Sequence, residues 1–462
     1  MNNQDTIIAL ATPSGVGAIA ILRISGTDAI SICNNLFKSI HNKNLLNQST
    51  HSLHLGNIID GSRVLDEVLI SLFKNPQSYT GEDIIEISCH GSYYIQQEIL
   101  QLFIRNGCRA AAPGEFTLRA FLNGKLDLSQ AEAVADLIAS DSASAHEIAL
   151  QQMRGGFSSE IKELREELLN FASLVELELD FSEEDVAFAD RKQFEELTER
   201  IIRVLKHLID SFSTGNVIKN GIPISIIGAP NVGKSTLLNT LLNEDKAIVS
   251  NIAGTTRDAI EDELIIEGIK FRFIDTAGIR NTTDLVESIG IEKTYEKMSQ
   301  SKVIIHLIDP TTITNSNISS VTNSINRTKN KYPNTECIVV LNKMDVINDS
   351  KISTLLLKLN PLKISAKNGN GIDKLKVKLL DLIKTGKLNN NDTIITNVRH
   401  YNALLEALKN IKSVQKGLLS GVSGDLLAID IRQVLYHFGC ITGEISTDDL
   451  LGNIFSNFCI GK

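Results

Sequence analysis

Residues Gly228-Ala-Pro-Asn-Val-Gly-Lys-Ser235 decide the fold of the middle of this chain. They follow an apolar run, 222–227, that is typical of a buried strand, and the apolar spacing behind them opens a helix. A GxxxxGKS pattern between a strand and a helix forms a loop whose backbone N–H groups surround phosphate. Lys234 is then expected to reach the β- and γ-phosphates, and the Ser235 hydroxyl to bind Mg²⁺. The stretch therefore predicts a nucleotide-binding α/β domain.

Two further motifs complete a phosphate site. Asp275-Thr-Ala-Gly278 ends the apolar run 271–274, where an aspartate can hold Mg²⁺ through water and the Gly278 N–H can contact the γ-phosphate. Thr255-Thr256 lies between the first helix and the next strand, where a threonine is needed to coordinate Mg²⁺. We therefore predict Mg²⁺ ligands at Ser235 and Thr256, and catalytic roles for Lys234 and Asp275.

Asn342-Lys-Met-Asp345 follows a third apolar run and selects the base. Asp345 offers two acceptor oxygens to the N–H pair of guanine, which adenine lacks, so GTP is favoured over ATP. Ser365-Ala-Lys367 follows a fourth run and can contact the base through its backbone. The expected GTP-binding residues are Asn231, Val232, Gly233, Lys234, Ser235, Thr236, Ser250, Asn251, Ile252, Ala253, Gly254, Thr255, Thr256, Asp275, Thr276, Ala277, Gly278, Asn342, Lys343, Asp345, Ser365, Ala366 and Lys367.

The residue after Gly278 indicates how GTP is hydrolysed. Ile279 stands where many small GTPases place a glutamine that orients the attacking water, and isoleucine cannot do so. Hydrolysis therefore needs another device. Arg257, Arg280 and Glu287 are candidates by their proximity in sequence, and each can equally be a solvated surface charge.

The chain changes texture three times, which predicts its domain organisation. Residues 1–123 mix short apolar runs with turn residues and one helical stretch, as in an α/β domain. Residues 124–215 have helical spacing, 216–384 alternate strands and helices, and 385–462 are helical again. We expect α/β plus all-α architecture, with a central helical bundle whose two parts pack together around an inserted, Ras-like, doubly wound GTPase domain.

Composition excludes several classes of protein. A net charge of -9 excludes a basic nucleic-acid-binding surface over the whole chain, so RNA contact needs a local patch or a partner. The six cysteines form no CxxC pair, which argues against a zinc ribbon and fits a reducing cytosol. The sequence shows no signal peptide and no run of about 20 apolar residues. We therefore expect a cytoplasmic protein. We also expect no lipid anchor, because Cys459-Ile-Gly-Lys462 is a poor match to a prenylation box.

From end to end the chain resembles the MnmE family, also called TrmE, of tRNA-modification GTPases. The block 113–127 and the terminal tetrapeptide 459–462 are specific to this family among GTPases, whereas the nucleotide motifs are not. The matching segments are Tyr79-Thr-Gly-Glu-Asp83, Cys89-His-Gly91, Pro113-Gly-Glu-Phe-Thr-Leu-Arg-Ala-Phe-Leu-Asn-Gly-Lys-Leu-Asp127, Gly254-Thr-Thr-Arg-Asp258, Asp275-Thr-Ala-Gly-Ile-Arg280 and Cys459-Ile-Gly-Lys462.

The resemblance implies a potassium-activated GTPase that dimerises through its GTPase domains. Asn231 would coordinate K⁺ with its side chain, joined by Ser250, Ile252 and Thr255 from the loop that wraps the nucleotide. Ser250 stands where the family often has threonine, which matters little if that ligand is a backbone carbonyl. The cation would stabilise charge between the β- and γ-phosphates. Glu287 matches the family's water-orienting glutamate.

The resemblance also implies a tetrahydrofolate site in the N-terminal domain, at a dimer interface. Arg23, Glu86 and Lys125 fit the folate-contacting positions, together with Lys462 at the chain end. The anionic glutamyl tail of the 5,10-methylene or 5-formyl derivative suits Arg23 and Lys125, and Glu86 could accept hydrogen bonds from the pterin. Cys459 matches a family cysteine, which can be a reactive thiol or a passive residue.

The implied partner is MnmG, a protein that uses FAD and NADH. In a heterotetramer the two proteins would add an aminomethyl or carboxymethylaminomethyl group to carbon 5 of the wobble uridine in tRNA. The acidic net charge suits a complex in which the partner makes most of the RNA contact. The alternative is a regulatory or ribosome-assembly GTPase without one-carbon chemistry, which would have no need of the N-terminal block or the terminal tetrapeptide.

Overall fold

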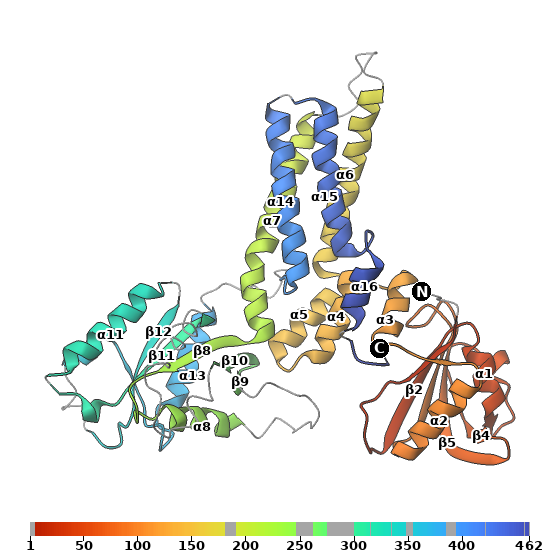
Figure 1. Ribbon diagram of the computed structural model, residues 1–462, viewed down its shortest axis with the longest axis horizontal. Coiled ribbons are helices and arrows are strands. Elements are labelled where there is room, and N and C mark those ends of the chain that lie inside the picture. Colours follow the sequence, from red (N-terminus) through yellow and green to blue (C-terminus); the bar gives the residue numbers. More distant parts are fainter. Residues whose placement is uncertain are drawn as a thin grey trace. The chain divides into compact units, whose positions relative to one another are not determined.

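The computed structural model describes residues 5–180, 191–245, 262–274, 300–314, 316–333, 335–347, 354–384, 394–420, 422–456 and 458–461. The chain divides into two compact units. One comprises Met1–Ala139, Ala149–Lys206 and Arg399–Lys462, and the other comprises Ser140–Ile148 and His207–Val398. The second unit therefore interrupts the first, as expected for an inserted GTPase domain (Figure 1).

A seven-stranded sheet forms the N-terminal part of the first unit, with strand order β3-β4-β5-β6-β2-β1-β7. Helices α1 (Ala29–Leu36) and α2 (Tyr93–Arg105) cover one face of this sheet, where alternate strand residues form a common apolar core with them. The strands are β1 (Ile7–Leu10), β2 (Ile19–Ser25), β3 (Phe37–Ser39), β4 (Ser52–Asp60), β5 (Arg63–Phe73), β6 (Ile84–His90) and β7 (Arg109–Ala110). The α/β prediction for this region is confirmed.

The opposite face of the sheet is covered only in part. Phe116 of α3 (Glu115–Leu122) packs on Ile7 and Ala9 of β1. Farther along the same face, Leu55 of β4 lies opposite Leu69 of β5, and both side chains are exposed. The residues that point to this face include Arg23 and Glu86, which pair across β2 and β6.

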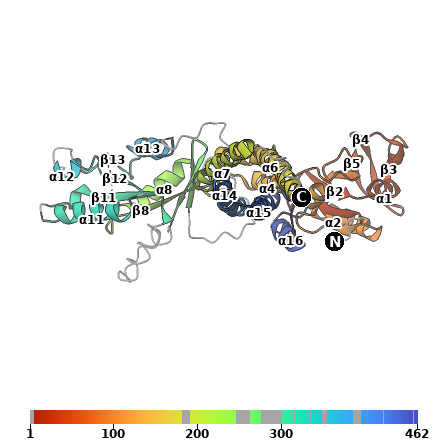
Figure 2. The same cartoon turned by 90° about the horizontal axis from the view of Figure 1, so that it is seen from above.

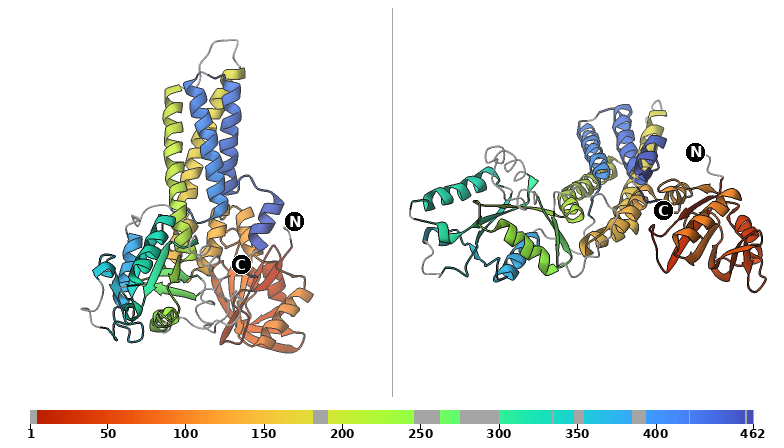
Figure 3. Two further views of the ribbon diagram at one scale, coloured as in Figure 1. Left: turned by 60° about the vertical axis from the view of Figure 1, so that its left-hand side comes forward. Right: turned by 60° about the horizontal axis from the view of Figure 1, so that its bottom comes forward.

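Long amphipathic helices form the rest of the first unit. In α6 (Gly156–Asp180) the buried residues Ile161, Leu164 and Leu168 recur every three or four positions, and this stripe packs against α15 (Gly424–Thr442). The helices before and after the insertion thus pack together as predicted (Figures 1 and 3), and Figure 2 shows them end-on. The other helices of this unit are α4 (Leu128–Ala139), α14 (Val398–Leu419) and α16 (Asp448–Ser456), whereas α5 (Ala143–Met153) and α7 (Arg191–Asn220) each belong in part to the second unit.

The second unit contains a six-stranded sheet of order β13-β12-β11-β8-β10-β9. Its strands are β8 (Ile222–Ile227), β9 (Asp262–Ile266), β10 (Ile269–Phe273), β11 (Val303–Ile308), β12 (Glu336–Leu341) and β13 (Leu362–Lys363). All neighbouring strands are parallel except β9 and β10. The carboxyl ends of the parallel strands therefore meet at one edge of the sheet, where ligands bind in doubly wound folds.

Helices lie on both faces of this sheet. On one face α8 (Lys234–Asp245) and α13 (Ile372–Lys384) contribute leucines to the main core of the unit. On the other face α11 (Ile318–Lys331) and α12 (Thr354–Leu357) pack on apolar residues of β11 and β12. This arrangement confirms the predicted doubly wound α/β domain.

Candidate functional site

The phosphate loop connects the end of β8 to the start of α8, as the sequence predicted. Gly228 and Gly233 have φ of +156° and +99°. A Cβ on Gly228 would lie 2.3 Å from the Leu307 carbonyl oxygen, and one on Gly233 would lie 2.4 Å from the Asn342 amide nitrogen. Neither position has room for a side chain, so the two glycines are required by both conformation and space.

Lys234 is the first residue of α8 and folds back on the loop. Its Nζ donates hydrogen bonds to the carbonyl oxygens of Gly228 (2.9 Å) and Ala229 (3.0 Å). Burial lowers the pKa of Lys234 from its ordinary value. The ammonium group thus lies within the loop, where a phosphate oxygen can replace the two carbonyl acceptors.

The base-recognition motif lies beside this loop. Asn342 is buried, donates from Nδ2 to the Val232 carbonyl oxygen (2.9 Å) and accepts at Oδ1 from the Ala366 N–H (2.9 Å). One side chain therefore joins the phosphate loop to residues 365–367. Thr240 of α8 also donates to the Ala366 carbonyl oxygen, at 2.7 Å.

Asp345 presents an exposed carboxylate in the same place. Ser365 Oγ donates to its Oδ1 at 2.6 Å, and this hydrogen bond lowers the pKa of Asp345. Each carboxylate oxygen can accept more than one hydrogen bond, so both oxygens remain able to accept from the N–H pair of guanine. The structure thus brings together three of the motifs that the sequence assigned to GTP.

Asp309 was missed in the sequence analysis. It directly follows β11, is 3% exposed in its side chain and forms an ion pair with Lys343 (2.6 Å). Burial would raise the pKa of Asp309, but hydrogen bonds from Lys343 and Thr311 hold it below the ordinary value. An aspartate after a buried strand, at the carboxyl edge of a parallel sheet, was the signal available in the sequence.

Several predicted residues lie outside the described ranges, and their predictions remain untested. They are the candidates Ser250, Asn251, Ile252, Ala253, Gly254, Thr255, Thr256, Arg257, Asp275, Thr276, Ala277, Gly278, Ile279, Arg280, Glu287 and Lys462.

A second constellation surrounds Arg23 in the N-terminal domain. Its guanidinium donates to Glu86 Oε1 from Nε (2.9 Å) and lies 2.7 Å from the same oxygen through Nη2. It also lies 5.5 Å from the ring centroid of Tyr79 and 5.8 Å from that of Phe116, and Nη1 donates to the Gly461 carbonyl oxygen at 3.4 Å. Sequence reasoning paired Arg23 with Glu86 as folate contacts but missed the two aromatic rings.

The end of the chain is closely fitted against this site. Gly461 has φ of +96°, and a Cβ there would lie 2.3 Å from the Leu10 carbonyl oxygen. The exposed Cys459 accepts a hydrogen bond from the Gly114 N–H through its carbonyl oxygen, at 3.4 Å. The segment 458–461 thus lies against β1 and the start of α3. Lys125, another predicted folate contact, donates a hydrogen bond to the Pro76 carbonyl oxygen (2.9 Å).

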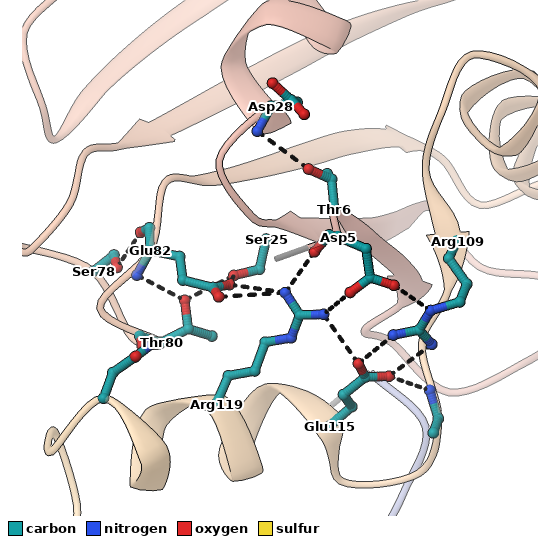
Figure 4. A network of polar contacts seen from close by, with 12 residues as sticks. Asp5, Thr6, Ser25, Asp28, Ser78, Thr80, Glu82, Arg109, Glu115 and Arg119 are labelled. Carbon is teal, nitrogen blue, oxygen red and sulfur yellow. Dashed lines mark hydrogen bonds and ion pairs between the residues drawn. The ribbon is translucent and has the colours of Figure 1, made fainter. Parts of the chain in front are cut away.

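The loop that carries Tyr79, residues 76–82, is held to α3 by a network of charges (Figure 4). Arg119, with a side chain 2% exposed, donates to the backbone carbonyl (2.7 Å) and carboxylate (2.6 Å) of Asp5. It also donates to Glu82 (3.2 Å) and Glu115 (3.1 Å). Beside Glu82 in the loop, the Tyr79 hydroxyl lies 2.8 Å from Thr117 Oγ1 on α3. Arg119 therefore connects the chain start, the 76–82 loop and α3.

The charges in this network shift one another's protonation. The hydrogen bond from Arg109 lowers the pKa of Asp5 against the effect of burial. Burial would raise the pKa of Glu115, but hydrogen bonds from Arg109 and Arg119 hold it below the ordinary value. Burial also raises the pKa of Tyr79.

Within the described residues, no helix has the length and apolarity needed to span a membrane.

Known proteins resemble this chain along its whole length. Residues 128–459 match the family model described as the MnmE helical domain, and residues 6–125 match that of the GTP-binding protein TrmE N-terminus. The "tRNA modification GTPase MnmE" of Flavobacterium johnsoniae is 63% identical, and that of Christiangramia forsetii is 61% identical; each match covers 100% of both chains. Among solved structures, the FeoB G-domain from Methanococcus jannaschii is 24% identical with a TM-score of 0.25, and covers 35% of this chain and 98% of its own.

Proposed function

Because this chain belongs to the MnmE family of tRNA modification GTPases, we propose that it couples K⁺-activated GTP hydrolysis to folate-dependent modification of the tRNA wobble uridine. The family membership makes the chain a GTP hydrolase that acts in tRNA modification. Activation by K⁺, use of folate and assembly with an FAD-dependent partner are what we propose beyond this membership. The observation that carries it is the Arg23 cluster, formed by Arg23, Glu86, Tyr79 and Phe116, because nucleotide hydrolysis alone has no use for it.

In the GTPase domain, the chain's own groups bind the phosphates and position water. The phosphate-loop amides and Lys234 hold the nucleotide, Ser235 and Thr256 would hold Mg²⁺, and Glu287 would orient the attacking water. The exposed side chain of Asn231 carries an amide oxygen, which is the hard type of donor that K⁺ takes. Bound K⁺ would supply positive charge at the phosphates, where other GTPases use an arginine.

Turnover in different salts tests the cation. GTP hydrolysis should be at least about tenfold faster in K⁺ than in Na⁺, because one well-placed electrostatic contact to a transition state contributes that much or more. Asn231→Ala should erase the difference while the protein still binds GDP. Equal rates of the unaltered protein in the two salts would refute the K⁺ mechanism without affecting the folate part.

In the N-terminal domain, the described residues fit a flat anionic ligand. Tyr79 and Phe116 flank the Arg23 guanidinium, which can pair with a carboxylate, and Glu86 can accept N–H groups. Bound tetrahydrofolate, in its 5,10-methylene or 5-formyl form, would supply the one-carbon unit. Lys125 and Lys462 would add positive charge. Cys459 would supply a thiol near the chain end.

Calorimetry with 5-formyltetrahydrofolate tests whether the Arg23 cluster binds folate. We expect binding that weakens about tenfold or more in Arg23→Ala, because hydrogen bonds to charged groups contribute about 1.5–3 kcal/mol. Absence of binding, or binding indifferent to Arg23→Ala, would favour the alternative of a regulatory or assembly GTPase without one-carbon chemistry.

We further infer a homodimer that assembles with MnmG and tRNA in the cytoplasm. The sheet face that carries Arg23 also exposes Ile19, Leu53, Leu55 and Leu69, a group of apolar side chains that suits contact with a second copy. Leu69→Glu should therefore shift the sedimentation of the protein toward the monomer, whereas Val377→Glu, an exposed apolar position on α13, should not. A monomer before any substitution would refute the dimer.

A further inference from the structure

The phosphate loop is held from outside by two neighbouring residues of the base-recognition motif. Lys343 Nζ donates to the Asn231 carbonyl oxygen at 2.8 Å, and Asn342 Nδ2 donates to the Val232 carbonyl oxygen at 2.9 Å. In a trans peptide the C=O and the following N–H point in opposite directions. The N–H groups of Val232 and Gly233 must then point away from residues 342–343, as a loop that binds phosphate requires.

This arrangement includes two unusual backbone conformations. Asn231 has φ of +61° and Lys343 has φ of +62°, in the left-handed region that disfavours residues with a side chain. Such conformations persist where the surroundings fix them, and they gather at functional sites. The hydrogen bond that joins Lys343 to Asn231 connects the two.

Asp309 is the group that holds Lys343 in place. Its carboxylate accepts at Oδ2 from Lys343 Nζ (2.6 Å) and at Oδ1 from the Thr311 N–H (2.9 Å) and hydroxyl (2.6 Å). Both oxygens are thus engaged, and the nearly buried side chain has little freedom to turn away. A lysine alone is a flexible cation, but one held by a fixed carboxylate has a defined direction.

We propose that Asp309 is a positioning residue for phosphate binding. It fixes Lys343, which fixes the Asn231 carbonyl and thereby the direction of the loop amides. Asp309 itself touches neither phosphate nor base. This role concerns nucleotide binding, so it stands independently of the K⁺ and folate parts of the proposed function.

The role separates two ligands that share the base. Guanosine can bind only to the base-recognition residues around Asp345, whereas GDP also binds to the phosphate loop. Asp309→Asn keeps the shape of the side chain and removes the charge that holds Lys343. We expect GDP affinity to fall about 10- to 100-fold, as for loss of a charge-assisted hydrogen bond, and guanosine affinity to change less than about twofold.

Calorimetry with guanosine and GDP on the full chain measures both affinities. Asp345→Asn is the contrasting variant, because it should weaken both ligands. Thr311→Val is the matched control, because it removes another donor to Asp309 without touching Lys343, and it should leave GDP affinity within about threefold. Circular dichroism of each variant checks that it is folded.

Two results would overturn the role: unchanged GDP affinity in Asp309→Asn, or a loss that is equal for GDP and guanosine. If Asp309→Asn fails to fold, Lys343→Met removes the same contact from the other end and keeps most of the apolar stem. It should then show the same selective loss of GDP affinity, and a proportional loss for guanosine would count against the role.

Discussion

The nucleotide site and the Arg23 cluster prepare charged groups for a ligand in opposite ways. In the nucleotide site the Asp345 carboxylate is exposed, and it accepts a hydrogen bond from the neutral hydroxyl of Ser365. In the cluster, Arg23 is already paired with the Glu86 carboxylate and contacts the Gly461 carbonyl. A base can therefore add hydrogen bonds to Asp345, whereas an anion at Arg23 must share or displace an existing ion pair.

The difference teaches where each site obtains its selectivity. An exposed carboxylate with free acceptor capacity discriminates by hydrogen-bond pattern. A cation that is already neutralised contributes less net affinity, so the aromatic rings and the network behind them matter more. Four substitutions break or sharpen this contrast, in order of decreasing effect.

The largest effect is expected from Arg119→Leu. This change leaves Asp5, Glu82 and Glu115 buried or half-buried without their shared cation, which costs about 3–5 kcal/mol. Urea unfolding followed by circular dichroism, with hydrogen exchange of the 76–82 loop, measures the loss. Arg109→Leu is the control, since its side chain is 48% exposed and should contribute only about 1 kcal/mol.

The same network gives a dependence on pH. The folded pKa values of Asp5 and Glu115 lie below their ordinary 3.8 and 4.5. A group whose pKa falls on folding stabilises the protein above its unfolded value, and this stability is lost as pH falls through the folded value. Protection of the 76–82 loop should therefore be constant above about pH 5 and decline below about pH 4. Arg109 makes the larger hydrogen-bond contribution to both shifts, so a decline that is unchanged in Arg109→Leu would assign it to other groups.

Asp345→Asn should cause the next largest effect. Guanine loses a charged acceptor, so GTP affinity should fall about 100-fold. The amide N–H can instead donate to the C2 carbonyl of xanthine, so affinity for xanthosine triphosphate should rise. Fluorescence titration with both nucleotides measures the switch, and an equal loss for both would mean that Asp345 acts on the loop and not on the base.

Arg23→Lys should have a smaller effect on 5-formyltetrahydrofolate binding than Arg23→Ala. Lysine keeps the charge but lacks the planar guanidinium that lies near the rings of Tyr79 and Phe116. We expect about a fivefold loss of affinity by calorimetry for the lysine variant. If the lysine variant binds folate as well as the unaltered protein, charge alone governs binding at the Arg23 cluster and the contrast with the nucleotide site disappears.

Lys125→Ala should have the smallest effect. Its ammonium is exposed and donates to the Pro76 carbonyl oxygen, so its contribution at the protein surface is small. We expect folate affinity to change less than about threefold in calorimetry. A tenfold loss would instead place Lys125 in direct contact with the ligand.

Much of the nucleotide site could be predicted because its chemistry is local in sequence. A loop between a strand and a helix binds phosphate wherever it occurs, and Asn342-Lys-Met-Asp345 selects guanine by its own donors and acceptors. Periodicity also predicted the inserted α/β domain and the helices on either side of it. These features depend on the backbone repeat and on short motifs, which the linear sequence contains in full.

The remaining contacts were decided only by the tertiary structure. Asp309 meets Lys343 because parallel strands β11 and β12 end at the same edge of the sheet. Arg23 meets Tyr79, Phe116 and Gly461, and these four residues come from four distant segments. The sequence determined which chemical groups were available, and the chain topology determined which of them pair. Contacts between residues far apart in sequence produce no periodic pattern or fixed spacing, so they cannot be predicted from the sequence alone.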